Sequence, residues 1–261
     1  MLPYACMSDV HSAASEGFAR EALRYSRGRP DYPRELLSWL RGQLRLGPDS
    51  TVVDLGAGTG KFTQLLLQAG AKVTAIEPVD AMRAQLGRNL PGVKALAGTA
   101  QAIPLADGAA DAVVCAQAFH WFATREALAQ IHRALAPGGR LGLIWNVRDE
   151  SVDWVAAISR IITPYEGDAP RFHTGAWRQV FDGTLFSAMQ ETTFAHQHVG
   201  GAQEVIIDRC LSISFIAALP APEKARVADK LKALIVTHPQ LKDRPVIAFP
   251  YQTRAYWCIG V

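Results

Sequence analysis

Between residues 51 and 145, short apolar runs alternate with longer stretches whose apolar residues recur at helical spacing. Apolar runs without a polar alternation are typical of strands buried on both faces. The pattern predicts strands over 51–55, 72–77, 93–97, 112–117 and 141–145, with helices over 61–70, 81–89 and 125–136 between them. Strands that alternate with helices indicate an α/β fold with a doubly wound, parallel sheet.

The pattern changes after residue 147. Residues 150–237 read as helices and loops with one strand over 186–199 and a helical break at Pro220, and residues 251–261 contain a final strand. We expect one domain over residues 1–261, with a flexible N-terminus over 1–14 and a cofactor-binding core over 51–147. The region 150–237 would then be a variable elaboration that covers the substrate, as a lid over the carboxyl edge of the sheet.

The first predicted strand runs into a glycine-rich turn, VVDLGAGTG, from Val52 to Gly60. Glycines between a strand and a helix N-terminus let several backbone N–H groups face one ligand. A phosphate-binding P-loop is excluded, because Leu55 stands at its first glycine and Phe62 follows Lys61. The dinucleotide fingerprint G-x-G-x-x-G is missed by one residue at its third glycine.

Two acids narrow the choice of nucleotide. Asp54 at the mouth of the turn would repel a pyrophosphate but favours the sulfonium and ammonium groups of S-adenosylmethionine. Glu77, about twenty residues further on at the end of the second strand, can accept hydrogen bonds from both ribose hydroxyls. This set favours S-adenosylmethionine, and a nicotinamide-dependent oxidoreductase is the weaker alternative.

Composition and charge exclude several other classes. The net charge of +3 comes without a Lys/Arg block, so a nucleic-acid partner is not expected. The four cysteines are scattered without a C-x-x-C pair, which indicates thiols in a reducing compartment. Neither a membrane-spanning run nor a signal peptide is visible, so we expect a cytoplasmic protein.

Several motifs resemble those of class I S-adenosylmethionine-dependent methyltransferases, and most closely the methyltransferase type 11 group. YSRGRPDYP, starting at Tyr25, resembles the leading segment of the trans-aconitate methyltransferase-like branch, and the group also includes ubiquinone-biosynthesis-like enzymes. VVDLGAGTGKFT resembles the family's first motif, followed by TAIEPVDAMRAQL, GTAQAIPL, AQAFHWF and ALAPGGRLGLIWN. The resemblance covers most of the chain and implies a Rossmann-like, seven-stranded sheet whose last strand is antiparallel.

The resemblance also implies a cofactor site for S-adenosylmethionine, which becomes S-adenosylhomocysteine after transfer. Glu77 would hold the ribose, Met82 would pack on the adenine, and Tyr25 and Arg29 would close over the methionine end. The full expected cofactor set is Tyr25, Arg29, Asp54, Gly56, Ala57, Gly58, Thr59, Glu77, Pro78, Met82, Thr99, Ala100, Gln101 and Gln117.

The acceptor should be a small molecule bound at the carboxyl ends of the fourth and fifth strands. The expected pocket consists of Phe119, His120, Trp121, Asn146 and Arg148, with Arg148 either holding an acid or pairing with a neighbouring carboxylate. His120 is a candidate base or substrate anchor. Aromatic and basic residues suited to a roof over the site are Tyr25, Arg29, Tyr32, Tyr165 and Trp177.

The expected function is methyl transfer to a carboxylate or hydroxyl oxygen, by in-line displacement and without a metal. The Asn/Asp-Pro-Pro-aromatic tetrad of nucleobase-methylating enzymes is missing after the fourth strand, and so are the paired acids of magnesium-dependent catechol-type enzymes. His196 and His198 share a strand face without a third ligand at metal-binding spacing. A methyltransferase-like protein that binds the cofactor for a regulatory role stays open as an alternative.

Overall fold

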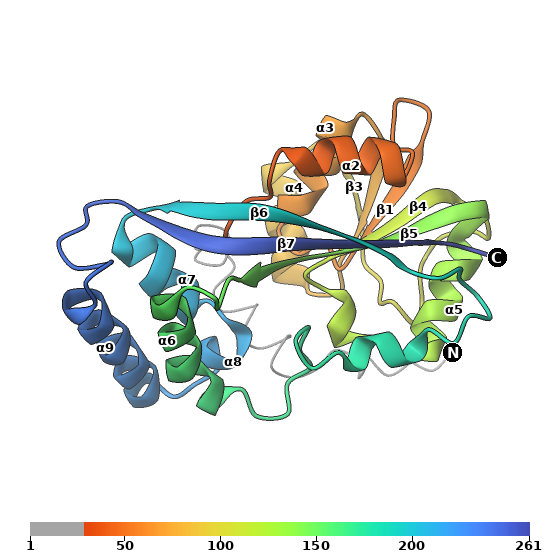
Figure 1. Cartoon of the computed structure of the whole chain (residues 1–261). Coiled ribbons are helices and arrows are strands. Elements are labelled where there is room, and N and C mark those ends of the chain that lie inside the picture. Colours follow the sequence, from red (N-terminus) through yellow and green to blue (C-terminus); the bar gives the residue numbers. More distant parts are fainter. Residues whose placement is uncertain (1–28) are drawn as a thin grey trace.

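A seven-stranded sheet in the order β3-β2-β1-β4-β5-β7-β6 runs through the whole molecule (Figure 1). The computed structural model describes residues 29–261, so the expectations for residues 1–14 and for Tyr25 fall outside the described residues. The strands are β1 (Thr51–Leu55), β2 (Lys72–Ile76), β3 (Lys94–Leu96), β4 (Ala110–Ala116), β5 (Leu135–Arg148), β6 (Gln190–Gly200) and β7 (Ile247–Ile259). Strands β1 to β5 are mutually parallel, whereas β7 runs antiparallel to both β5 and β6, as expected.

Helices cover both faces of the parallel half of the sheet. In Figure 1, α2 (Glu35–Gln43), α3 (Lys61–Ala69) and α4 (Asp80–Asn89) lie above it, and α5 (Arg125–Ala134) lies below. The strand residues alternate accordingly: Val52 packs in the core under α2 and α3, whereas Val53 packs in the core that contains the α5 residues. Successive side chains of a strand point to opposite faces of the sheet, and both faces are packed here. This explains the unbroken apolar runs of the sequence.

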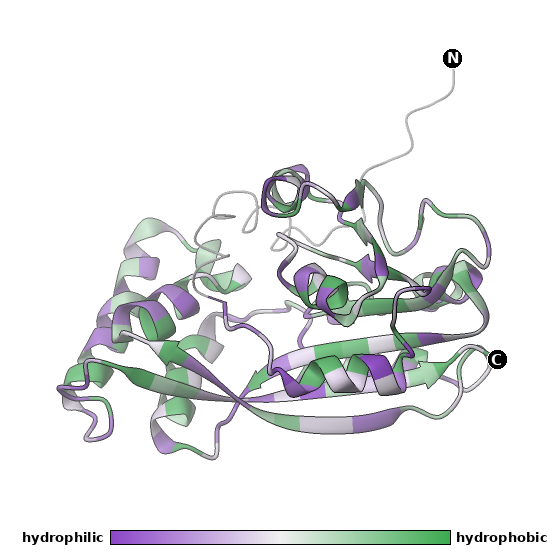
Figure 2. Ribbon diagram, turned by 90° about the horizontal axis from the view of Figure 1, so that it is seen from above, coloured by the Kyte–Doolittle hydropathy of each residue, from purple (hydrophilic) through white to green (hydrophobic). Residues whose placement is uncertain are grey.

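A second core lies beneath the long extension of β6 and β7. It is formed by α6 (Asp153–Ile162), the π-helix η4 (Gln203–Asp208), α7 (Arg209–Leu211), α8 (Ser214–Ala217) and α9 (Ala221–Thr237). The β7 residues Phe249 and Tyr251 close this core from the sheet side. Figure 2 shows that these helices carry both apolar and polar residues, as expected for helices with one packed face.

The predicted strands and helices are all present, but several of their ends were wrong. The predicted helix over 125–136 ends at Ala134, because Leu135 already pairs with Ala110 of β4 and Pro137 disfavours helical geometry at Ala136. Strand β7 begins at Ile247, four residues early, because Ile247 already pairs with Gly200 of β6. In contrast, Phe186 forms only an isolated bridge, and β6 begins at Gln190.

Candidate functional site

The glycine-rich turn after β1 forms the floor of a crevice at the carboxyl edge of the sheet. At Gly56 the backbone has φ of 74°, and a Cβ there would lie 2.7 Å from the Ala118 Cβ. At Gly58 φ is 59° and the space where a Cβ would stand is open. The crevice is lined by Arg29, Pro30, Tyr32, Asp54, Gly56, Ala57, Gly58, Thr59, Lys61, Phe62, Ala116, Gln117, Asn146 and Arg209. The open face at Gly58 is a cradle in which a ligand could lie against the main chain.

Asp54 lies at the base of the glycine-loop crevice and is fully buried. Its Oδ2 accepts a 2.6 Å hydrogen bond from the Thr63 hydroxyl of α3, whereas Oδ1 is buried without a hydrogen-bond partner in the described part of the chain. Burial, together with the nearby charge of Glu77, raises the Asp54 pKa to about 7. A buried carboxylate oxygen that lacks a donor is costly unless a ligand supplies one.

Glu77 holds the glycine loop from beside the crevice. Its Oε2 accepts from the Gly58 backbone N–H at 2.8 Å, and its Oε1 accepts from the Val79 N–H at 2.9 Å. Burial raises the pKa of Glu77 above its ordinary value, against these two hydrogen bonds. A carboxylate has about four acceptor positions, so two remain for a ligand's hydroxyl groups.

The segment 29–32 crosses the crevice and is fastened on both sides. The Lys61 ammonium donates to the Arg29 carbonyl and pairs with Asp31 at 3.0 Å. On the other side the Asn146 amide donates to the Asp31 carbonyl at 2.9 Å and accepts from the Thr253 hydroxyl at 2.6 Å. Asn146, a predicted substrate-pocket residue, therefore also positions the crossing segment, and both ends of its amide are already bonded.

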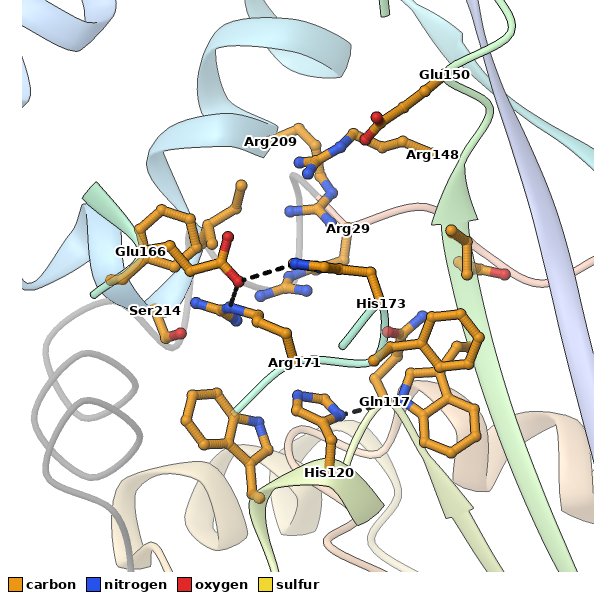
Figure 3. A pocket seen from close by; sticks show the side chains of 17 residues that line it. Arg29, Gln117, His120, Arg148, Glu150, Glu166, Arg171, His173, Arg209 and Ser214 are labelled. Carbon is orange, nitrogen blue, oxygen red and sulfur yellow. Dashed lines mark hydrogen bonds and ion pairs between the residues drawn. The ribbon is translucent and has the colours of Figure 1, made fainter. Parts of the chain in front are cut away.

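A larger chamber opens beside the crevice and shares Arg29, Gln117, Asn146 and Arg209 with it. Figure 3 shows the chamber, which we call the arginine chamber. Its lining also includes His120, Trp121, Trp145, Val147, Arg148, Glu150, Glu166, Arg171, Phe172, His173, Ile213, Ser214 and Phe215. The chamber thus connects the glycine loop to the elaboration after β5.

Four arginines line the chamber: Arg29, Arg148, Arg171 and Arg209. Arg209 is the most deeply buried of them, at 8% exposure. It is the first residue after the π-helix η4, and such helices frequently occur at functional sites. Its Nε and Nη1 atoms are buried without a hydrogen-bond partner in the described part of the chain. A buried guanidinium with unsatisfied N–H groups is unfavourable in the absence of an anion.

Arg171 and Glu166 form an ion pair across the chamber, with 3.1 Å between Nε and Oε1 (Figure 3). The Arg171 guanidinium lies 4.3 Å from the centre of the Phe215 ring. Burial lowers the Arg171 pKa to about 10, Glu166 raises it, and repulsion from Arg148 and Arg209 lowers it further. Positive charge is therefore in excess in the chamber, where four arginines face two glutamates.

The backbone at the end of β4 is strained where the crevice and the chamber meet. Gln117 has φ of 59°, a left-handed conformation that is uncommon for a residue with a side chain. Its N–H donates to the Ile144 carbonyl of β5 at 2.8 Å, which holds the turn in place. Such strained residues cluster at functional sites.

Several residues predicted for the site lie elsewhere. Phe119 is fully buried in the main core, where its ring packs edge-to-face on Trp177, so neither residue lines the chamber. This happens because the single turn η1 (Phe119–Trp121) points His120 and Trp121 into the chamber and Phe119 away from it. Tyr165 packs against the second core instead of lining the chamber. The predicted cofactor residue Pro78 does not line the crevice either, and neither do the predicted adenine-side residues Met82, Thr99, Ala100 and Gln101.

Sequence reasoning missed Arg209, Glu166 and Trp145 as lining residues. Arg209 follows the apolar run 205–207 and lies three residues after Ile206 and four residues before Ile213. At this helical spacing the three side chains share one face, which is expected to be apolar because it packs against the core. A charged residue on an apolar helix face is a signal that could have identified it. Residues 29–261 contain no cluster of metal-ligating side chains and no helix long and apolar enough to cross a membrane.

The strand order and the glycine loop after β1 define a class of protein. An α/β sheet with order 3-2-1-4-5-7-6 and one antiparallel strand is the fold expected of a Rossmann-like methyltransferase. The crystal structure of the YcgJ protein from Bacillus subtilis has the same fold, with a TM-score of 0.54 and 18% identity over 87% of this chain and 98% of that one.

The sequence comparisons then identify the family. Residues 53–143 match the family model of a methyltransferase domain. An uncharacterized methyltransferase-like protein of Schizosaccharomyces pombe is 36% identical over 240 residues, which cover 92% of this chain and 93% of the relative. An uncharacterized methyltransferase of Mycobacterium tuberculosis is 38% identical over 239 residues, with 92% and 93% coverage. The chain belongs to the class I S-adenosylmethionine-dependent methyltransferases, in the methyltransferase type 11 group.

Proposed function

We propose that the protein uses S-adenosylmethionine to methylate a carboxylate oxygen of a small organic acid. The observation that carries this proposal is the excess of arginine in a chamber that opens directly into the glycine-loop crevice. Arg209 is the strongest single support, because two N–H-bearing nitrogens of its buried guanidinium have no partner among residues 29–261. Paired guanidinium N–H groups match a carboxylate in both charge and geometry.

The crevice fits the cofactor on its own chemistry. Oδ1 of Asp54, which has no partner among the described residues, can accept a hydrogen bond from an ammonium group, and the open cradle at Gly58 leaves the backbone accessible. Glu77, one residue beyond β2, keeps acceptor positions for ribose hydroxyls while it holds the loop. Arg29 lines both the crevice and the chamber, so it can reach the carboxylate of the methionine end.

Positioning of the acid against the cofactor's methyl group should supply most of the acceleration of methyl transfer. When bound, S-adenosylmethionine carries a methyl group that a carboxylate oxygen can attack directly, with the electron pair of the broken carbon–sulfur bond remaining on sulfur. The arginines would hold the acid, the strained turn at Gln117 would bring it to the crevice, and the crossing segment 29–32 would exclude water. An ionised acid needs no residue to remove a proton.

A screen with methyl-labelled S-adenosylmethionine tests this proposal. Small carboxylic acids should be compared with the corresponding amides, alcohols and amines, and with phenols and quinone precursors. We expect transfer to acids and none to the matched amides, because an amide is neutral and gains little from the arginines. Preferred transfer to amines or phenols would contradict the proposal, and tight cofactor binding without any transfer would favour a regulatory role.

The raised pKa of Asp54 indicates how cofactor binding should depend on pH. Because its pKa in the free protein is about 7, the side chain is mostly protonated at pH 6 and ionised at pH 8. A ligand ammonium favours the ionised form, so binding must release a proton at pH 6 but not at pH 8. The affinity for S-adenosylhomocysteine should therefore rise about tenfold between these values.

Calorimetry in buffers of different ionisation enthalpy measures both the affinity and the released proton. Asp54→Asn should bind more weakly at pH 8, with little change in affinity between pH 6 and pH 8. A wild-type affinity that falls as the pH rises would contradict the assigned role of Asp54.

A further inference from the structure

His120 lies on η1, directly after the strained turn, and its ring lines the arginine chamber (Figure 3). The Trp145 indole N–H donates to His120 Nδ1 across 3.0 Å. An indole nitrogen is only ever a donor, so Nδ1 must present its lone pair. In a neutral imidazole the single proton is then on Nε2.

This tautomer is held in place by the packing of Trp145. The indole is 1% exposed and lies in an aromatic cluster, with ring centres 4.7 Å from Trp177 and 4.9 Å from Phe172. The donor therefore cannot turn away from His120 without disrupting the main core.

The charges around His120 keep its ring neutral. Burial, with repulsion from Arg171 and Arg29, lowers the His120 pKa to about 3. The charged and titratable groups that share the chamber are Arg29, Arg148, Arg171, Arg209, Glu150, Glu166 and His173. The two glutamates are already engaged, Glu150 by the Ser159 hydroxyl at 2.6 Å and Glu166 by Arg171.

We infer that His120 is a fixed N–H donor that positions the acceptor, with Nε2 donating to the carboxylate oxygen that is not methylated. This inference rests on the proposed function and specifies how the same site selects its acceptor. The nitrogen that could take a proton, Nδ1, is occupied by Trp145, so His120 does not act as a general base. Its other expected role, as a substrate anchor, is the one that this geometry supports.

The arrangement also explains which acceptors the chamber should reject. A carboxylate loses no proton during methylation, whereas a phenol or alcohol must lose one as its oxygen forms the new bond. Because the Trp145 indole N–H occupies Nδ1, His120 cannot take that proton, which would have to pass to another group of the chamber such as His173 or Glu150. His120 therefore favours acids over hydroxyl compounds, independently of the charge of the arginines.

Two variants and a pH profile separate a donor from a base. His120→Ala should lower kcat/KM for the acid by about 10- to 100-fold, the usual loss for a hydrogen bond to a charged group. His120→Gln retains an N–H donor and should recover most of that loss. A general base at His120 would give the wild-type kcat/KM an ionisation between pH 5.5 and 8 that both variants lack. We expect no such difference between the wild type and the variants.

Nitrogen NMR of the ring provides a readout that does not depend on the acceptor. The His120 resonances, assigned by their loss in His120→Gln, should show an Nε2-protonated neutral ring from pH 5 to 8. The inference is overturned if the ring titrates near pH 6.5, or if His120→Gln is as inactive as His120→Ala. If the wild type methylates no acid while the NMR result holds, the proposed function fails and the assigned tautomer stands.

Discussion

Replacing Glu77 with alanine should weaken the binding of S-adenosylhomocysteine by about 10- to 150-fold. The reason is that one carboxylate would have two tasks: it accepts from the Gly58 and Val79 N–H groups, and we propose that it also accepts from the ribose hydroxyls. Hydrogen bonds to a charged group contribute about 1.5–3 kcal/mol, which corresponds to this loss of affinity. Calorimetric titration with S-adenosylhomocysteine measures it.

Two further variants make the Glu77 result specific. Glu77→Gln keeps one acceptor oxygen and should bind with intermediate affinity. Asp80→Asn removes a nearby acid whose side chain is 85% exposed and pairs with Arg83, so this variant should bind the cofactor normally. Unchanged affinity of Glu77→Ala would show that Glu77 neither shapes the loop nor holds the ribose.

The second large effect is expected at Arg209. Arg209→Met should lower kcat/KM for the acid on the order of 100- to 1,000-fold, because it leaves a carboxylate in the chamber without its buried partner. Affinity for S-adenosylhomocysteine should change little, since Arg29 is the residue assigned to the methionine carboxylate. Arg209→Lys keeps the charge but not the planar guanidinium, so its kcat/KM should lie between those of the wild type and Arg209→Met.

Thermal unfolding distinguishes a loss of kcat/KM at the site from misfolding of the Arg209→Met variant. A buried guanidinium with unsatisfied N–H groups costs free energy, so Arg209→Met should unfold at the same or a higher temperature than the wild type. Arg160→Met, on the exposed side of α6 at 72% exposure, removes one positive charge and should retain activity. If Arg209→Met instead loses cofactor affinity and keeps acceptor affinity, Arg209 belongs to the cofactor site.

The fold was largely predictable because its signals are local. Strands buried on both faces appear as unbroken apolar runs, and the glycine loop between β1 and α3 must fall at the carboxyl edge of a parallel sheet. The ends of strands were less predictable because partners far along the chain determine them. Ile247 belongs to β7 only because Gly200 pairs with it.

The proposed acceptor site was only partly predictable, for a related reason. His120, Trp121 and Arg148 follow strands whose position the pattern indicates, and they do line the chamber. Arg209 is the first residue of α7, 61 positions after the last residue of β5, and no periodicity predicts where that helix packs. Phe119 and Trp177 show the converse: aromatic residues near a site were assigned to its wall, but the turn η1 buries Phe119 against Trp177.

Methyl transfer from S-adenosylmethionine to a carboxylate is tested most directly by following the methyl group. Labelled S-adenosylmethionine is incubated with the protein and the best small acid, and the product is treated with mild base. We expect one equivalent of S-adenosylhomocysteine for each methyl ester formed, release of the label as methanol, and loss of both in Arg209→Met. Label that stays on a base-stable product, or an Arg209→Met variant as active as the wild type, would contradict this expectation.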